Sequence, residues 1–245
     1  MTVEADDSYG AVAGEEVPAA PAPRRRRWPR RLFRLAVALA LAPLVLTVVY
    51  WLVPPVSTLM LADLVTGRGY TRDWVSFDEI SPQLPMAVVM GEDGKFCSHG
   101  GVDWDSLGAV LSRSGGPNRG ASTVTMQTVK NLYLWNGRSY LRKAMEIPLA
   151  LYVDLVWSKR RTMEIYLNIA EWGPNLYGAE AAAQKYFKKP AAKLTRHEAA
   201  LLVSALPNPI ERNPAKPGKY QARYARTVER RTAQAGAYVD CLFDR

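Results

Sequence analysis

The stretch Glu92-Asp93-Gly94-Lys95-Phe96-Cys97-Ser98-His99-Gly100-Gly101-Val102-Asp103 sets two adjacent carboxylates at the head of a glycine-containing segment. Two later stretches, Ser-Thr-Val-Thr-Met-Gln-Thr-Val-Lys-Asn at 122–131 and Arg-Lys-Ala-Met-Glu at 142–146, add another carboxylate, amides and cations. A positioned carboxylate can accept a proton from a hydroxyl group. Clustered cations can stabilise the charge of a departing phosphate. The combination predicts an enzyme that moves a group from a phosphorylated donor.

The composition allows one sizeable folded domain and favours an anionic partner. The chain has 245 residues, of which 48% are hydrophobic, and it carries a formal net charge of +9. Residues 1–34 contain seven arginines against five acidic residues, so the remainder of the chain is itself basic. Such a charge suits nucleic acid, a lipid surface or a phosphorylated substrate. The three stretches quoted above favour the phosphorylated substrate, and no nucleic acid is expected.

An apolar run follows the arginine-rich segment and predicts a membrane anchor. Residues 35–53 contain no charged side chain. A helix of this length matches the roughly 30 Å hydrocarbon core of a bilayer. The alternative is a cleaved signal peptide, whose apolar core spans only about 7–15 residues. By the positive-inside rule, the N-terminus is cytoplasmic and the residues beyond Val53 lie outside the membrane.

The chain divides into four predicted segments. Residues 1–31 are a disordered basic cytoplasmic tail, and residues 32–53 are a single N-terminal transmembrane helix. Residues 54–78 are a connector near the membrane, and residues 79–245 are the catalytic domain. No alternating run predicts a large sheet, so this domain is expected to be mainly α. Its predicted helices cover residues 103–111, 122–134, 139–157, 162–169, 179–187, 199–206 and 220–239.

Several residues predict where these helices begin or bend. Ser122 and Ser139 have the side chains of helix N-caps. Residues 195–198 form a capping box before the helix at 199–206. Arg142 and Glu146 stand four residues apart and share one helix face, and a proline two positions after Glu146 is expected to kink the helix.

The two cysteines, Cys97 and Cys241, leave two possibilities open. Outside the membrane an even pair can form a disulfide. Two unpaired thiols are the alternative, since one cysteine lies within the first motif and the other at the chain end. His99 and His197 have no cysteine partners at metal-ligand spacing.

Five ordered motifs lie between residues 80 and 210. They consist of Glu92, Asp93, Phe96, His99, Gly101 and Asp103; Ala121 through Gln127 with Lys130 and Asn131; Arg142, Lys143 and Glu146; Lys159 through Glu164 with Tyr166, Leu167, Asn168 and Gly173; and Glu198 through Ala200 with Leu206, Pro207 and Pro209. Together they resemble the family 51 peptidoglycan glycosyltransferases. Residues 170–173 and 178–183 are similar to its monofunctional, membrane-anchored branch. The sequence has no Ser-x-x-Lys or Lys-Thr-Gly motif, so no penicillin-binding transpeptidase module is expected.

Three positions depart from the family pattern. Ala121 replaces a glycine, and Met126 replaces the first of two glutamines and cannot supply an amide contact. Pro148 is unexpected so close to the third motif. These departures concern the level of activity more than the assignment to the family.

The resemblance implies a mainly α, lysozyme-like glycosyltransferase domain that polymerises lipid II. A growing glycan on a lipid pyrophosphate is donated, with inversion, to the 4-hydroxyl of a second lipid-linked disaccharide. The implied catalytic residues are Glu92, as general base on that hydroxyl, and Glu146. Glu146 is expected to orient the cations, hold a divalent metal or assist the leaving group. The implied substrate-binding residues are Lys130, Arg138, Lys143, Arg142, Gln127, Asn131, Ser122 and Thr123.

The resemblance also implies the surroundings of the enzyme. A divalent metal, Mg or Mn, is a candidate cofactor, and no organic cofactor is expected. The expected partners are lipid II and the growing glycan chain, with cell-wall synthesis or division proteins as candidates. The expected location is the inner (plasma) membrane, with the catalytic domain in the periplasm.

Each assignment has a simpler alternative. In the simpler interpretation, Glu92 forms a surface ion pair and the cations form a solvated basic face. Glu146 then only pairs with Arg142 within one helix. Ser122 is otherwise only a helix cap. Glu164, Tyr166 and Asn168 are expected to be structural, and His99 a packing and hydrogen-bonding residue.

Two other classes of function compete with the polymerase. A lysozyme-like lytic enzyme also uses a glutamate in a mainly helical domain, but hydrolysis of neutral glycan does not need clustered cations around a phosphate. A non-enzymatic, single-span scaffold with a basic face would not require the five motifs.

Overall fold

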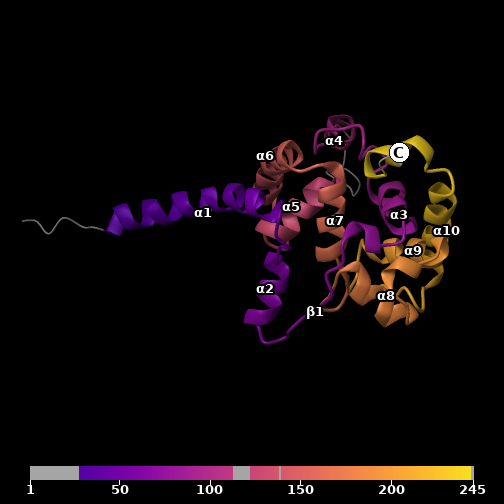
Figure 1. Ribbon diagram of the computed structural model, residues 1–245. Helices are drawn as coiled ribbons and strands as arrows, with labels where there is room; N and C mark the ends of the chain where they lie inside the picture. Colours follow the sequence, from indigo (N-terminus) through magenta and orange to yellow (C-terminus); the bar gives the residue numbers. More distant parts are fainter. Residues whose placement is uncertain (1–27, 113–121, 138, 244–245) are drawn as a thin grey trace, which may run out of the picture. The chain divides into compact units, whose positions relative to one another are not determined.

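The structure is a computed structural model that describes residues 28–112, 122–137 and 139–243. It falls into two units, residues 1–38 and residues 39–245. In the first unit the described residues are the beginning of helix α1 (Trp28–Tyr50). The second unit is mainly helical with one small sheet, which confirms the predicted fold class (Figure 1). The tail predicted for residues 1–31 lies almost entirely outside the described residues.

Helix α1 contains the predicted apolar run up to Tyr50, three residues short of the predicted end at Val53. Its segment Arg30–Tyr50 is long and apolar enough to cross a membrane, and 6% of its most apolar window is buried inside the protein. Pro43 lies within the helix without ending it. The helix ends at Tyr50, and the next residues form a turn. The described helix is therefore compatible with membrane anchoring.

The helices of the second unit agree with most of the predicted ranges. Ser139 caps α6 by accepting a hydrogen bond from the Arg142 backbone N–H, and the capping box of Thr195 and Glu198 opens α9. The α-helices after α1 are α2 (Thr58–Val65), α3 (Gln83–Glu92), α4 (Trp104–Leu111), α5 (Val124–Tyr133), α6 (Tyr140–Val156), α7 (Lys159–Ile169), α8 (Ala179–Phe187), α9 (Arg196–Ala205) and α10 (Lys219–Thr232). Within the described ranges, the short 3-10 helices are η1 (Phe77–Glu79), η2 (Ala191–Lys193) and η3 (Gly236–Leu242).

Predicted helix ends in α5, α7 and α10 are corrected, and α9 begins at Arg196, within its capping box, rather than at residue 199. Thr123, not Ser122, caps α5, because the Thr123 hydroxyl accepts the Met126 N–H while that of Ser122 accepts from Lys143. Helix α7 begins before the predicted residue 162, because Ser158 caps it. The last helix ends at Thr232, well before the predicted residue 239. The φ of +40° at Gly236 is incompatible with an α-helix, and the chain continues as η3.

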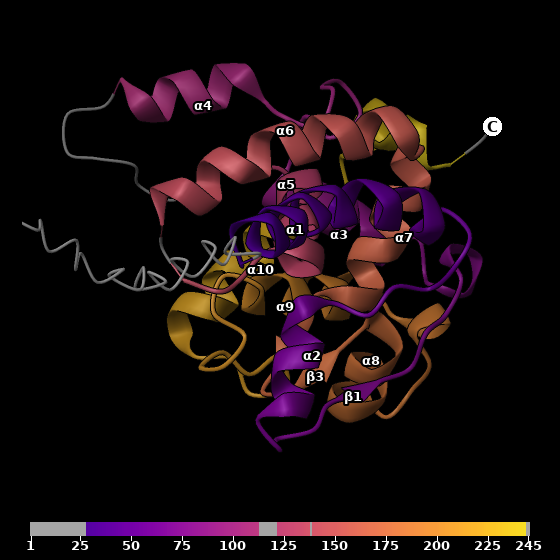
Figure 2. The ribbon, with the colours of Figure 1, turned by 90° about the vertical axis from the view of Figure 1, so that its left-hand side faces the viewer.

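Pro148 does not end helix α6, which continues past it to Val156. Figure 2 shows α6 as one long helix that passes over α5. The proline removes one backbone donor from the helix, and the predicted kink at this position stays a prediction. Contacts between α5 and α6 hold the third motif against the second.

A small three-stranded sheet lies beside the helices. The strands are β1 (Thr71–Arg72), β2 (Glu171–Gly173) and β3 (Leu176–Tyr177), in the order β1-β3-β2. Strand β3 is parallel to β1 and antiparallel to β2. Asn175 in the β2–β3 turn has a φ of 54°, a conformation that asparagine tolerates better than most residues. The sheet ties the connector before α3 to the chain after α7.

The hydrophobic core consists of two clusters that meet at helix α7. Met163, Tyr166 and Leu167 pack into a cluster shared with α3, α8 and α9. Ile165 and Ile169 pack into a second cluster shared with α2, α5 and α6. Because α7 contributes to both, it is buried on nearly all sides. Helix α10 packs against α9 and α3 on the outer side of the first cluster (Figure 1).

A disulfide settles the question that the two cysteines left open. Cys97 and Cys241 are bonded, with their Cα atoms 5.6 Å apart. The bond joins the segment that follows Glu92 to η3 near the end of the chain. It closes a loop with a sequence separation of 144 residues. In the chain-entropy account, a loop of this size gives a large stabilisation, because its closure restricts the unfolded chain.

The disulfide predicts a redox-dependent stability. Replacing both residues, Cys97→Ser with Cys241→Ser, is expected to lower the free energy of unfolding by about 2–5 kcal/mol, measured by chemical denaturation. A reductant should lower the stability of the unaltered protein by a similar amount. The same reductant should leave the double variant unchanged. Equal stability of the oxidised and reduced proteins would contradict a disulfide in the native protein.

Candidate active site

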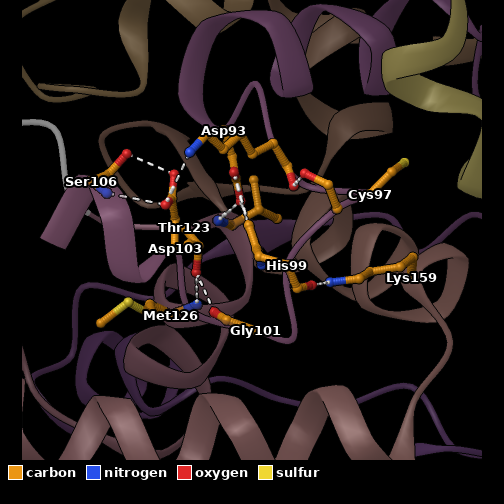
Figure 3. A network of polar contacts seen from close by, with 12 residues as sticks. Asp93, Cys97, His99, Gly101, Asp103, Ser106, Thr123, Met126 and Lys159 are labelled. Atoms are coloured by element: carbon orange, nitrogen blue, oxygen red, sulfur yellow. Dashed lines mark hydrogen bonds and ion pairs between the residues drawn. The ribbon is translucent and has the colours of Figure 1, made fainter.

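The buried carboxylate of Asp93 organises the first motif. Asp93 is 7% exposed and follows the last residue of α3. Its carboxylate accepts hydrogen bonds from the Val124 backbone N–H at 2.9 Å and from His99 Nε2 at 3.0 Å (Figure 3). Val124 is the first residue of α5, so the negative charge also lies at the positive end of a helix. These bonds offset the cost of burying the charge and join the first motif to the second.

A second set of contacts holds the rest of the first motif. The Thr123 hydroxyl donates to the Gly101 carbonyl at 2.6 Å, and the Lys159 ammonium donates to the His99 carbonyl (Figure 3). Gly101 has a φ of +85°, and a Cβ there would lie 2.5 Å from the Ala150 carbonyl oxygen. Only glycine fits this close approach to α6. The first motif therefore requires a glycine at position 101 for a structural reason.

Glu92 is half-buried at the end of α3. Gln127 on α5 donates from Nε2 to Glu92 Oε2 at 3.1 Å. Burial raises the pKa of the Glu92 carboxyl, and the Gln127 hydrogen bond and the charge of Lys130 oppose that rise. A carboxylate with a raised pKa is a stronger base in its ionised form. The site thus gives Glu92 the properties of a general base.

Cations from α5 and α6 gather beside this carboxylate. Burial lowers the pKa of Lys130, and the neighbouring Arg142 lowers it further. Burial, Arg142 and Lys130 together lower the pKa of Lys143 to about 8. The positive charges therefore disfavour one another's protonated forms. An arrangement of this kind is suited to a strongly charged anionic group.

Glu146 holds two of these cations. Its side chain is buried, at 2% exposure. One carboxylate oxygen pairs with Arg142, and the other accepts from the Lys143 ammonium at 3.0 Å. Lys143 also donates to the Ser122 hydroxyl at 2.7 Å. The predicted pairing of Arg142 and Glu146 is therefore present, as part of a larger ionic cluster.

The residues that the structure describes offer no ready-made cage of protein ligands for the predicted divalent metal. Among them, no group of three or more His, Cys, Asp or Glu side chains could hold a metal ion. Both oxygens of Glu146 are engaged by cations, which a divalent metal would have to displace. The carboxylate of Asp93 is likewise engaged by His99 and Val124.

The other predicted substrate-binding residues have different surroundings. Thr123 is 3% exposed, and its hydroxyl serves the α5 cap and Gly101, so the structure gives it a structural role. Asn131 is 7% exposed, and its backbone carbonyl accepts from the Thr58 hydroxyl. Ser122 is exposed beside Lys143. Arg138 and Ala121 lie outside the described residues.

The structure adds two residues that the sequence did not connect with Glu92. The Tyr166 hydroxyl donates to Gln127 Oε1 at 3.2 Å, although Tyr166 was expected to be structural. The charge of Arg212, which follows α9, acts on Glu92 and opposes the rise of its pKa. By contrast, Asn168 bonds the backbone of Val75 and is structural, as predicted.

Comparison with known proteins identifies the family. The model of the transglycosylase family matches residues 60–233, which include the whole of the site described above. The chain belongs to this family. The match begins in α2 and ends just after α10, so it also covers the helices that pack around the site.

Curated relatives align along nearly their whole length. A protein named biosynthetic peptidoglycan transglycosylase from Agrobacterium fabrum is 56% identical over 219 residues, which cover 88% of this chain and 97% of the relative. A protein of the same name from Brucella suis is 59% identical, over 85% of this chain and 95% of the relative. Another from Rhizobium johnstonii is 52% identical, over 95% and 99%. The resemblance found in the five motifs is therefore confirmed.

Proposed function

We propose that this transglycosylase family member polymerises lipid II into linear glycan strands, with Glu92 as its general base. Family membership supports peptidoglycan glycosyltransferase activity. The observation that supports the roles of the residues is the juxtaposition of a half-buried carboxylate of raised pKa with a cluster of cations on α5 and α6. A base and an anion site side by side are what transfer from a diphosphate donor to a hydroxyl requires.

The proposed reaction is a single displacement. Glu92 takes the proton of the acceptor 4-hydroxyl as that oxygen forms a bond to the anomeric carbon of the donor glycan. The bond from this carbon to the lipid diphosphate breaks, and its electron pair leaves with the diphosphate. One displacement inverts the configuration at the anomeric carbon, and no covalent intermediate on the protein is needed.

The cation cluster is proposed to bind the diphosphate. Lys130, Lys143 and Arg142 offer both point charges and a planar guanidinium, which suits phosphate oxygens. Arg138 is proposed to join them, by the resemblance alone. Charge grows on the diphosphate during the reaction, and fixed cations in a poorly hydrated site stabilise that charge strongly.

Glu146 is proposed to keep the cluster in position. Its two salt bridges hold Arg142 and Lys143 at one place on α6, next to α5. Without it, two long cationic side chains would repel each other and spread into solvent. Gln127, Asn131 and Ser122 are proposed as polar contacts to substrate. The divalent metal stays a prediction, and no step of this mechanism depends on it.

The lytic alternative has no specific support. Hydrolysis of a neutral glycan leaves no diphosphate for the cations to bind, and the relatives are named for biosynthesis. A scaffold without activity is also disfavoured, since Glu92 has the raised pKa of a catalytic carboxyl rather than the environment of a surface ion pair.

We further propose that α1 is a single membrane span of the inner membrane. Arg30, Arg31 and Arg34 precede its apolar run, so the N-terminus is placed in the cytoplasm and the catalytic domain in the periplasm. There the site meets lipid II and the growing glycan. Cell-wall synthesis or division proteins are candidate partners.

Replacing the base should separate binding from catalysis. Glu92→Gln is expected to bind lipid II normally and to lose about 10²–10⁴-fold in the rate of glycan extension, because the amide cannot accept the proton. Polymerisation would be measured with purified full-length protein and labelled lipid II. Glu211→Gln, at an exposed carboxylate, is the control and should keep its activity. Substantial extension by the Glu92 variant would contradict the assigned role.

The low pKa of Lys143 predicts a loss of activity at alkaline pH. An ammonium is charged below its pKa, so kcat/KM should fall as the pH rises through about 8. Lys143→Arg should move this fall to higher pH, because a guanidinium normally titrates only above pH 12 or so. Lys189→Arg, at a lysine paired with Glu198, should leave the profile unchanged. An unmoved fall in the Lys143 variant would exclude this lysine as its cause.

The proposed orientation can be tested in spheroplasts. Protease added outside the inner membrane should degrade the domain that follows α1 and spare a tag fused to the N-terminus. A detergent-treated sample, in which both parts are accessible, is the control. Protection of the domain together with loss of the tag would reverse the proposed orientation.

A further inference from the structure

Tyr166, Gln127 and Glu92 form a chain of hydrogen bonds from the core to the site. Tyr166 is 1% exposed on α7, at the helix that joins the two hydrophobic clusters. Its hydroxyl donates to Gln127 Oε1 at 3.2 Å, and Gln127 Nε2 donates to Glu92 Oε2 at 3.1 Å. Three helices, α3, α5 and α7, each supply one member.

The Gln127 amide has a donor, Nε2, and an acceptor, Oε1. Its orientation therefore decides whether Glu92 faces a hydrogen-bond donor or an acceptor. With Nε2 toward Glu92, the amide donates to the carboxylate and favours its ionised form. With the amide reversed, Oε1 would face Glu92 and favour the protonated acid. The reversed amide would also turn its N–H₂ group toward the Tyr166 hydroxyl, whose own buried proton would lose its acceptor.

From this geometry we infer that Tyr166 is a positioning residue for the base: its hydroxyl fixes the Gln127 amide in the orientation that keeps Glu92 ionised and ready to accept a proton. The inference rests on the proposed role of Glu92. Tyr166 acts through Gln127 and touches neither the hydroxyl acceptor nor the diphosphate. It therefore differs from the cations, which act on the leaving group.

Tyr166 keeps its proton throughout the working range of pH. Burial raises the pKa of its phenol well above the ordinary value, and the nearby carboxylates of Glu92 and Asp93 act in the same direction. The phenol is thus a permanent donor. A residue that changed its own charge near neutral pH could not hold the amide in one orientation.

The other groups facing Glu92 act by charge and leave the amide unaffected. Lys130 on α5 and Arg212 after α9 favour the ionised carboxylate, and the neighbouring Asp93 disfavours it. On α10, the Tyr224 hydroxyl donates to the Gly91 carbonyl at 2.8 Å, so its proton is engaged next to Glu92. Removal of the Tyr166 hydroxyl leaves all four in place, and the change can be attributed to the amide.

The test is the pH dependence of kcat/KM for lipid II with the full-length protein. Tyr166→Phe should raise the acid limb of the profile by about 0.5–1 pH unit, the range expected from one hydrogen bond. Below the limb this corresponds to a loss of about three- to tenfold, and the rates should converge on the plateau at higher pH. A purely structural role would lower the rate equally at every pH.

Tyr186→Phe is the matched control. It also deletes a tyrosine hydroxyl that donates at 3.2 Å, here to the Trp172 carbonyl, but none of its contacts reaches Glu92. It should leave the acid limb unmoved. Thermal unfolding of both variants measures their losses of stability, so that a loss of folded protein can be separated from a shift of the limb.

A second variant keeps the inference testable if Tyr166→Phe does not fold. Gln127→Leu removes the bond to Glu92 and should raise the acid limb at least as much. In that background Tyr166→Phe should add no further shift, since its effect passes through Gln127. An unmoved limb in Gln127→Leu, or in folded Tyr166→Phe, would overturn the inference. An active Glu92→Gln would instead overturn the role of the base itself.

Discussion

The burial of the Asp93 carboxylate is the constraint on which the site depends. A buried carboxylate needs compensating hydrogen bonds, and here they come from the first backbone N–H of α5 and from His99. The N-terminus of α5 cannot move away from the end of α3 without leaving that charge uncompensated. Glu92, the preceding residue, is thereby held against the same helix. The hydrogen bonds that the buried Asp93 requires therefore fix the position of Glu92.

Helix α5 carries structural and site residues in successive turns. At its N-terminus, the Val124 backbone N–H donates to the Asp93 carboxylate, and the Thr123 hydroxyl donates to the Gly101 carbonyl. Gln127, one turn later, reaches the base, and Lys130 lies a further turn on. Helix α6 packs beside it and supplies Arg142 and Lys143 with their common partner Glu146. The base and the cations are adjacent because α5 contacts Glu92 through Gln127, carries Lys130 and packs against α6.

Local interactions made much of this predictable from the sequence. Ser139 and the Thr195–Glu198 capping box bond backbone groups only three residues away, and both were placed correctly. The cap of α5 was not, because Ser122 and Thr123 are equally suited to it. The choice depends on the Gly101 carbonyl, 22 residues away in the sequence, which accepts from Thr123.

The same limit applies to the site. The family resemblance brought Glu92, the cations and Glu146 together, but the contact of Tyr166 with Gln127 spans 39 residues of sequence. Nothing local distinguishes this tyrosine from the other buried residues of α7. Its hydroxyl is assigned to the site only when α5 and α7 are packed against each other. The disulfide, between residues 144 apart, was left undecided for the same reason.

Burial acts on the two halves of the site with opposite sign. It raises the pKa of Glu92 and lowers the pKa of Lys130 and Lys143, so in each case it opposes the charged form that the reaction needs. Binding of a diphosphate changes this balance. Its negative charge favours the protonated lysines, which strengthens their hold on the donor. The same charge makes the ionised Glu92 a stronger base but, like burial, opposes its ionised form, which the Gln127 hydrogen bond and the charge of Lys130 support.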